Sequence, residues 1–324
     1  MRIIHISKYD HNTMQLAKPI FDHHRRVLLA AHHVIHPKYL EKLLQIGVRQ
    51  LIVEDSETRG ITLEEMIDVP TWMDVVAVVE EFFNSPKKGV SFPIKNLQAA
   101  VGRLLMEIRN HPVLLPVPEQ TLPDPLRPYA HAVNVALLAL QVARNLGYNE
   151  IMMRDVAVGC LLHNIGSVIV KDPAEYPEVG FNLIRSIREF SLLSAHVIFQ
   201  HREKMDGTGF PRRLSGDTFH EYAQICGICS MYEELISDEN MPPHMAMETI
   251  MTLSDTAYRM DIVRAFVNSV PSYPPGTKIG MQDGQEAIVI KITEHMQRPV
   301  IRYLSSGEEV SLAENPTLII AKSL

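Results

Sequence analysis

The period of the hydrophobic positions changes along the chain and divides it into parts. Residues 1–70 combine short alternating runs with one helical pattern at 37–46, which predicts a small α/β module. Apolar residues then recur every three or four positions over 72–83 and 94–108, as they do in amphipathic helices. Residues 129–270 keep helical spacing almost throughout. The pattern therefore predicts a mainly α protein whose largest part is a helical domain.

Two segments interrupt the helical pattern. Six prolines fall between positions 111 and 128, and because proline lacks a backbone donor and disfavours helix before it, we expect an extended connector there. Beyond Pro271 the period falls to about two, over 287–292, 299–304 and 309–312, which predicts a small antiparallel β module. The predicted division is an N-terminal α/β module at 1–70, a helical and proline-rich connector at 71–128, a helical domain at 129–270 and a C-terminal β module at 271–324.

Composition and charge narrow the class of protein. The chain has 31 basic and 38 acidic residues, a formal net charge of −7, and no block of Lys and Arg, so nucleic acid is not expected as the main partner. No apolar run approaches the roughly 20 residues of a membrane span, and the strand-like N-terminus lacks a signal core, which predicts a cytoplasmic protein. The three cysteines, Cys160, Cys226 and Cys229, lie in apolar runs and are expected to be buried helix residues without disulfides.

Candidate chemistry is concentrated in the predicted helical domain. His131, His163 and His201 stand on apolar helical segments at wide spacing. Neutral imidazoles that project from different helices into one bundle interior are how such folds build metal sites. We therefore expect these three histidines to converge in one pocket.

The order of these motifs resembles that of the HD-GYP domain, a helical metal-dependent phosphohydrolase module that cleaves cyclic di-GMP. His131 matches the first metal-binding histidine of the family, His163 the histidine of its His-Asp pair, and His201 the first residue of its His-His-Glu motif. The loop from Asp206 to Pro211 matches the family's Asp-Gly-Ser-Gly-Tyr-Pro loop, with Phe210 in place of tyrosine. The resemblance implies a helical HD-type bundle, and it extends to the N-terminal and C-terminal modules.

Five chemically active positions depart from the family pattern. Relative to that pattern, Asn164 replaces the bridging Asp, Ser167 a Lys, Tyr176 a His ligand, Arg202 the second His and Ser230 the late Asp ligand. A two-metal site needs anionic oxygen ligands to hold its cations and to generate hydroxide. Two unit charges about 4 Å apart interact by about 4 kcal/mol at an effective dielectric near 20, so Arg202 would oppose a neighbouring cation. We expect no cofactor, or at most one divalent ion, iron or manganese, at His131, His163 and His201.

The basic residues around the loop suggest binding without a metal, because guanidinium groups contact phosphate oxygens directly. The expected ligand-binding residues are Arg202, Lys204, Asp206, Gly207, Gly209, Phe210, Pro211, Arg212 and Arg213. The alternative interpretation of these charges is a solvated loop face. Among partners, the resemblance leaves open a cyclic dinucleotide, a protein that docks on the Gly-Phe-Pro loop, and a second copy of the chain.

These observations lead to one main functional hypothesis and two alternatives. The main hypothesis is a degenerate HD-GYP-like protein that has lost metal-dependent phosphodiesterase activity and acts as a signalling or regulatory binding module linked to cyclic di-GMP. The first alternative is an enzyme that retains cyclic di-GMP phosphodiesterase activity with one metal held by the three histidines. The second is a structural partner module without any ligand.

Overall fold

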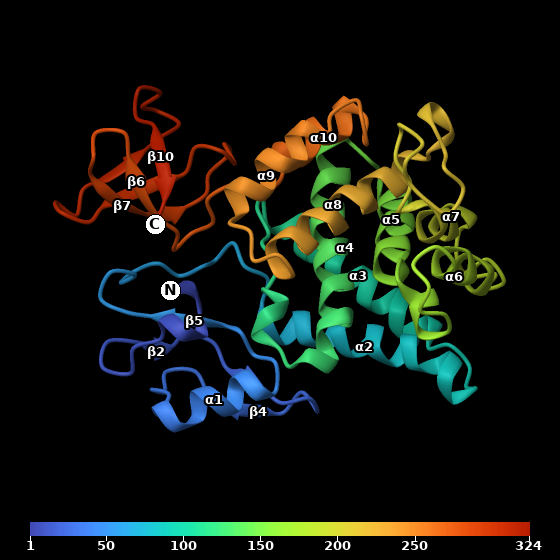
Figure 1. Cartoon of the computed structure of the whole chain (residues 1–324), viewed down its shortest axis with the longest axis horizontal. Helices are drawn as coiled ribbons and strands as arrows, with labels where there is room; N and C mark the ends of the chain where they lie inside the picture. Colours follow the sequence, from blue (N-terminus) through green and yellow to red (C-terminus); the bar gives the residue numbers. More distant parts are fainter.

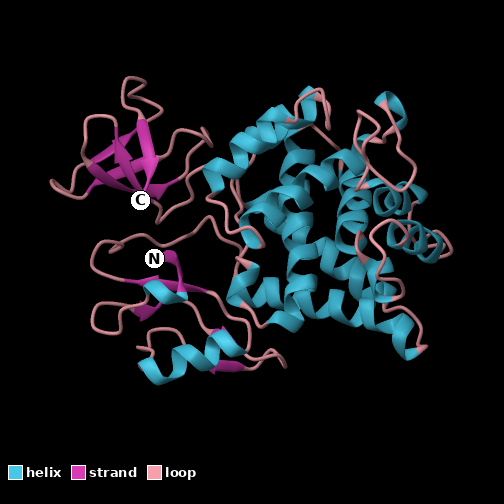
Figure 2. Ribbon diagram, in the orientation of Figure 1, coloured by secondary structure: helices cyan, strands magenta, loops and turns pink.

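The computed structural model describes residues 1–324 and places two small modules on the same side of a large group of helices (Figure 1). The strands are confined to the two modules and the long helices to the central domain (Figure 2). The predicted mainly α fold with a small module at each end is confirmed. None of the helices combines the length and apolar character needed to cross a bilayer.

The central domain is built around one buried helix. Every residue of α4 (Arg127–Asn145) from Ala130 to Ala143 is buried, because α2, α3, α5, α8 and α10 all contact it. The helices of this domain are α2 (Val69–Lys88), α3 (Ile94–Asn110), α4, α5 (Glu150–Leu162), α6 (Tyr176–Ile184), α7 (Leu192–Gln200), α8 (Glu221–Ser237), α9 (Pro243–Thr252) and α10 (Met260–Val267). Cys160, Cys226 and Cys229 are free thiols buried in this core, as predicted.

The first two helices of this domain belong to its core. Asp68 caps α2 by accepting a hydrogen bond from the backbone N–H of Thr71, and Gly89 ends the helix in the left-handed conformation. The apolar faces of α2 and α3 share one hydrophobic core with α4 and α8. The sequence analysis assigned both helices to the connector at 71–128, and in the structure both of them contact α4. Only the stretch from 111 to 126 is extended, apart from two short 3-10 turns, η2 (Glu119–Thr121) and η3 (Asp124–Leu126).

The N-terminal module has the predicted mixed α/β character. Its elements are β1 (Arg2–His5), the 3-10 turn η1 (Ile6–Lys8), β2 (Gln15–Leu16), β3 (Ile20–Phe21), β4 (Val27–Leu29), α1 (Pro37–Gln45) and β5 (Gln50–Glu54). β5 lies between β1 and β2 in an antiparallel sheet, and β3 and β4 form a separate hairpin. Alternate strand residues and one face of α1 fill a small core of their own, separate from that of the helices.

The C-terminal module is a five-stranded antiparallel sheet in the order β10-β6-β7-β8-β9. Its strands are β6 (Lys278–Met281), β7 (Glu286–Lys291), β8 (Val300–Tyr303), β9 (Glu309–Ser311) and β10 (Ile320–Ser323). The three predicted strands correspond to β7, β8 and β9. The pattern missed β6 and β10, which pair with each other at one side of the sheet.

The proline-rich stretch holds the three parts of the molecule together. Leu115 packs in the core of the C-terminal sheet, and the backbone of Leu114 exchanges hydrogen bonds with the side chain of Gln141 on α4. Farther along, the carbonyl of Gln120 accepts a hydrogen bond from the backbone N–H of Arg49 in the N-terminal module. The connector is therefore fixed to each of the three parts.

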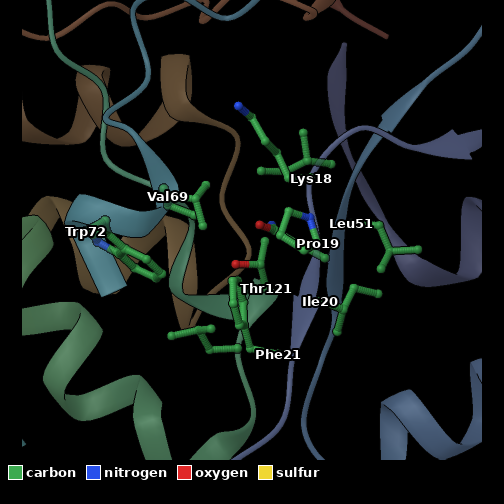
Figure 3. A pocket seen from close by; sticks show the side chains of 12 residues that line it. Lys18, Pro19, Ile20, Phe21, Leu51, Val69, Trp72 and Thr121 are labelled. Atoms are coloured by element: carbon green, nitrogen blue, oxygen red, sulfur yellow. The ribbon is translucent and has the colours of Figure 1, made fainter. Parts of the chain in front are cut away.

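The N-terminal module also packs directly on the first long helix. Figure 3 shows Val69 and Trp72 of α2 facing Phe21, Ile20 and Thr121 across a small pocket. The space left there is about 20 Å³, room for roughly one water molecule. This contact is therefore closely packed.

Candidate functional site

Three imidazoles meet in the interior of the helical domain. His131 lies on α4, and His163 and His201 directly follow α5 and α7. The ring centroids of His131 and His163 are 5.3 Å apart, and those of His163 and His201 are 5.0 Å apart. All three side chains are buried. The predicted convergence is found, while the metal-binding role of the three histidines stays a prediction.

Local backbone contacts orient two of these rings. His163 Nδ1 lies 2.6 Å from the carbonyl oxygen of Cys160, and His201 Nδ1 lies 2.8 Å from that of Ile198. Each carbonyl belongs to the residue three positions earlier, in the last turn of the helix. A carbonyl accepts only from a protonated Nδ1, so both rings direct the lone pair of Nε2 toward the site.

A guanidinium group enters this site from the residue that follows His201. Arg202 donates two hydrogen bonds to the carboxylate of Glu234, at 3.0 and 2.7 Å, and its Nε donates to the hydroxyl of Tyr176 at 3.0 Å. A paired, planar contact of this kind is the strongest form of Arg–carboxylate interaction. The carboxylate of Glu234 therefore balances the positive charge of Arg202. Its negative charge is not available to a second cation.

At two of the positions that depart from the family pattern, a hydroxyl group contacts an imidazole of the site. The oxygen of Tyr176 lies 3.0 Å from Nε2 of His201, and Oγ of Ser230 lies 3.3 Å from Nε2 of His131. Ser230 also donates to Glu234 at 3.2 Å. Together these contacts form a hydrogen-bonded network, which we call the Arg202 network: His131, Ser230, Glu234, Arg202, Tyr176 and His201.

The three histidines are neutral under ordinary conditions. Burial, reinforced by the charge of Arg202, lowers the pKa of His131 to about 3. Burial and the neighbouring His131 lower the pKa of His163 to about 3, and the pKa of His201 is lowered for the same kind of reason. The imidazoles therefore act as hydrogen-bonding groups and carry no charge.

The residues present do not fit the two-metal centre that the resemblance implies. Asn164 and Ser230 provide neutral oxygens where a two-metal site needs anionic ones, and Glu234 is already bound to Arg202. Three buried atoms at and beside the site lack any hydrogen-bond partner: Nε2 of His163, Oδ1 of Asn164 and Oε2 of Glu119. The first two are neutral, and Glu119 supplies one carboxylate oxygen beside His131, so at most a single ion would find ligands there.

Ser167 lies on the 3-10 turn η4 (Ile165–Val168) and is half-buried. The turn packs tightly against the start of α6, since a Cβ on Gly166 would lie 1.9 Å from the carbonyl oxygen of Tyr176. This close approach positions the Tyr176 side chain toward the Arg202 network. Ser167 itself makes no hydrogen bond through its side chain.

The loop that follows Arg202 is anchored by a buried carboxylate and by close backbone packing. The buried carboxylate of Glu203 accepts hydrogen bonds from the backbone N–H groups of Arg212 and Leu214, at 2.6 and 2.9 Å. Gly209 sits directly on the Glu203 backbone, where an added Cβ would lie 2.4 Å from the Glu203 Cα. Asp206, at the exposed turn, accepts from the backbone and hydroxyl of Thr208. The loop is therefore fixed by its own contacts.

The predicted ligand-binding residues are divided between the inside and the outside of this loop. Arg202 alone of the four basic residues enters the histidine site. Arg212 is exposed and lies over the ring of Phe199, with its guanidinium carbon 5.9 Å from the ring centroid. Arg213 is also exposed, and Lys204 is half-buried. The remaining loop residues, Asp206, Gly207, Gly209, Phe210 and Pro211, form the turn between them.

Sequence reasoning missed three acidic residues at and beside the site. Glu234 was detectable, because it follows Ser230 by four positions on one helix and so shares its face. Glu119 gave no signal in the proline-rich stretch, yet its carboxylate lies 3.7 Å from Nδ1 of His131. Glu233 accepts a hydrogen bond of 2.6 Å from Asn134, whose oxygen in turn accepts from the indole N–H of Trp72 at 2.9 Å.

The buried Glu233 predicts a measurable pH effect. Burial raises its pKa, so the folded protein retains a proton that the unfolded chain releases above about pH 4.5. This contribution to the free energy of unfolding is complete below the unfolded pKa and is lost as the pH rises through the folded one. Glu233→Gln keeps an acceptor for Asn134 but cannot ionise. We expect the variant to gain stability over wild type between pH 5 and 8, by up to about 1.4 kcal/mol per pH unit. The free energies of unfolding of both proteins are measured with urea at each pH. A difference between them that stays constant across this range would contradict the prediction.

Comparison with known proteins shows which proteins this chain resembles. Residues 116–262 match the family model described as HD domain. The cyclic di-GMP phosphodiesterase PA4108 of Pseudomonas aeruginosa is 26% identical over 235 residues, which are 66% of this chain and 56% of the relative. The cyclic di-GMP phosphodiesterase PdeB of Borreliella burgdorferi is 22% identical over 201 residues, 56% of this chain and 53% of the relative.

The chain spans about half the length of these curated relatives. Among solved structures, Bd1817, an HDG"Y"P protein from Bdellovibrio bacteriovorus, superposes with a TM-score of 0.50 at 15% identity. The match covers 82% of this chain and 97% of that one, so the likeness in fold extends beyond the helical domain. Residues 116–262 are thus similar to HD domains, and the chain is similar in sequence to cyclic di-GMP phosphodiesterases.

Proposed function

We propose that this protein is a regulatory member of its family that binds without hydrolysing, a signalling module linked to cyclic di-GMP. The observation that carries the proposal is the Arg202 guanidinium, bound to Glu234 and Tyr176 beside three neutral imidazoles. The relatives are named as cyclic di-GMP phosphodiesterases, and we extend only their ligand class to this chain.

The loss of hydrolysis follows from the charges at the site. A metal-activated water needs a cation held by anionic ligands, and the carboxylate of Glu234 is committed to Arg202. An ion placed among the imidazoles would meet the positive guanidinium and displace hydroxyl groups of Tyr176 and Ser230 from their nitrogen partners. In this proposal the site is most stable with the Arg202 network intact and without a metal ion.

Binding of a phosphodiester needs no metal in this arrangement. Arg202 is a bidentate donor at the site, and the same donor geometry that now serves Glu234 fits a phosphate. Lys204, Arg212 and Arg213 add positive charge along the loop outside. In this proposal the Gly209–Pro211 segment of the loop is the surface offered to a protein partner or to a second copy of the chain.

A phosphohydrolase with one metal is the second candidate. It is favoured by Nε2 of His163 and Oδ1 of Asn164, two buried lone-pair donors that have no hydrogen-bond partner. These two atoms are available to one divalent ion, iron or manganese, without disturbing Arg202.

Metal analysis and binding calorimetry separate the two candidates. We expect purified protein to contain well under one equivalent of iron or manganese and to show no turnover of cyclic di-GMP. With chelator present, wild type should still bind the dinucleotide, and Arg202→Ala should bind it at least tenfold more weakly, the scale of a charge-assisted hydrogen bond. Arg188→Ala, an exposed arginine remote from the network, is the matched control. Stoichiometric metal together with turnover would overturn the proposal in favour of the second candidate.

A further inference from the structure

A cavity of about 840 Å³ lies where the three parts of the molecule meet. Its walls come from β1 and η1 of the N-terminal module, from α4 and the end of α8, and from the segment that leads into β6. Figure 1 shows this junction between the two small modules and the helices. Its volume falls in the range of small-molecule sites, which occur preferentially at such interfaces. It is separate from the Arg202 network, none of whose residues lines it.

The helical wall of the cavity presents an unpaired acceptor. Glu233 is 1% exposed, and one of its carboxylate oxygens accepts from Asn134, while the other, Oε2, has no hydrogen-bond partner. Tyr232 stands beside it, and Leu138 and Ile236 supply apolar surface. In the ionised form of Glu233 a buried carboxylate oxygen without a partner is costly, so this wall favours a ligand that brings N–H donors and thereby stabilises that form.

The wall formed by β1 and η1 presents unpaired donors. The terminal nitrogens of Arg2 bind Asp55 and Glu57, but its buried Nε–H has no hydrogen-bond partner. Lys8 is exposed and forms no ion pair. This wall therefore favours a ligand with an anionic group. A single molecule that satisfies both walls must carry N–H donors at one end and an anion at the other.

The shape of the cavity is preset by rigid backbone. Prolines line it from three segments of the chain, with Pro116 in the connector, Pro242 before α9, and Pro271 and Pro274 before β6. Proline fixes its own backbone angle, so these walls lose little freedom when a ligand binds. Flat proline rings with the apolar side chains beside them suit a planar heteroaromatic body.

We propose that this cavity binds a purine nucleotide, with the N–H edge of the base on Glu233 and the phosphate on Lys8 and the Nε–H of Arg2. Guanine offers two adjacent N–H donors to a carboxylate, and adenine offers one amino group, so a guanine nucleotide is bound more tightly. The inference goes beyond the proposed function, because it concerns a different cavity and requires neither hydrolysis nor Arg202.

The bound nucleotide is placed to affect the histidine site. Glu233 and Glu234 are consecutive residues of α8, one at the cavity and the other in the Arg202 network. On α4, Asn134 lines the cavity one turn after His131. Both helices are thus shared walls of the two sites.

Calorimetry on the full chain with chelator present tests the proposal. We expect GMP to bind, AMP to bind at least fivefold more weakly, and ribose 5-phosphate weaker still. Glu233→Gln should weaken GMP at least tenfold, and Lys8→Ala should weaken GMP but leave guanosine unchanged. The controls Glu239→Gln and Lys38→Ala, exposed residues outside the cavity, should bind GMP as wild type does.

Three results would overturn it: no heat with GMP at millimolar concentration, equal affinity of wild type and Glu233→Gln, or ribose 5-phosphate binding as tightly as GMP. Lys8 is exposed, so its substitution gives a second readout that is independent of Glu233. GMP binding by Arg202→Ala should match wild type. A failure of the proposed function at Arg202 is thereby distinguished from a failure of this cavity site.

Discussion

Replacing Asn164 by Asp alone is expected to leave hydrolysis of cyclic di-GMP undetectable. The change restores one anionic oxygen, but Arg202 remains bound to Glu234, and Tyr176 and Ser230 still contact their imidazoles. Residues of a catalytic unit are strongly non-additive, so one restored ligand does not rebuild the rest. The measurement is product formation with added manganese or iron, followed by chromatography.

A combined variant provides the positive control. With Asn164→Asp, Tyr176→His, Arg202→His and Ser230→Asp together, the site regains the ligand types that the family pattern implies. We expect this variant to take up at least one equivalent of metal and to hydrolyse the dinucleotide at least 100-fold faster than wild type. Turnover by the Asn164→Asp variant itself would show that the original site was already adequate.

The substitution Trp72→Ala is expected to cause the largest loss of stability, about 3 to 5 kcal/mol in the free energy of unfolding. Trp72 of α2 is fully buried, and its indole N–H donates to Asn134 on α4. Removing the ring leaves a cavity and also leaves the Asn134 oxygen without its donor. Urea unfolding monitored by circular dichroism measures the change.

Two further variants separate these contributions. Trp72→Phe retains most of the ring volume but loses the donor, so its loss should be smaller, about 1 to 3 kcal/mol. Met106→Ala, at an exposed position of α3, should change the free energy by no more than about 0.5 kcal/mol. A Trp72→Ala protein as stable as the Met106→Ala control would contradict this account of the core.

The helices could be predicted from the sequence because most of them are amphipathic. Spacings of three and four residues located α2 and α3, yet the pattern did not reveal that they pack on α4, since packing partners are distant in sequence. Strand β10 escaped because Ile320–Ser323 lies at a sheet edge and does not alternate apolar and polar residues. A two-residue strand such as β2 is too short to establish any period.

The histidine site was predictable only where motifs were present. His131, His163 and His201 were found by their order, and their convergence follows from the helices that bear them. The partner of Arg202 was not found, because ion pairing depends on side chains that meet only after folding. Glu119 and Glu233 escaped for the same reason, since acidic residues are ordinarily exposed and only the structure reveals their burial.

The anchoring of the loop by Glu203 has a consequence for recognition kinetics. Ordering one loop residue costs roughly 1 to 2 kcal/mol, and here folding has already met that cost through the hydrogen bonds to Arg212 and Leu214. A protein that docks on Phe210 and Pro211 would therefore meet a surface of fixed shape. Its association rate would be set by diffusion and orientation, with no slow step of loop rearrangement.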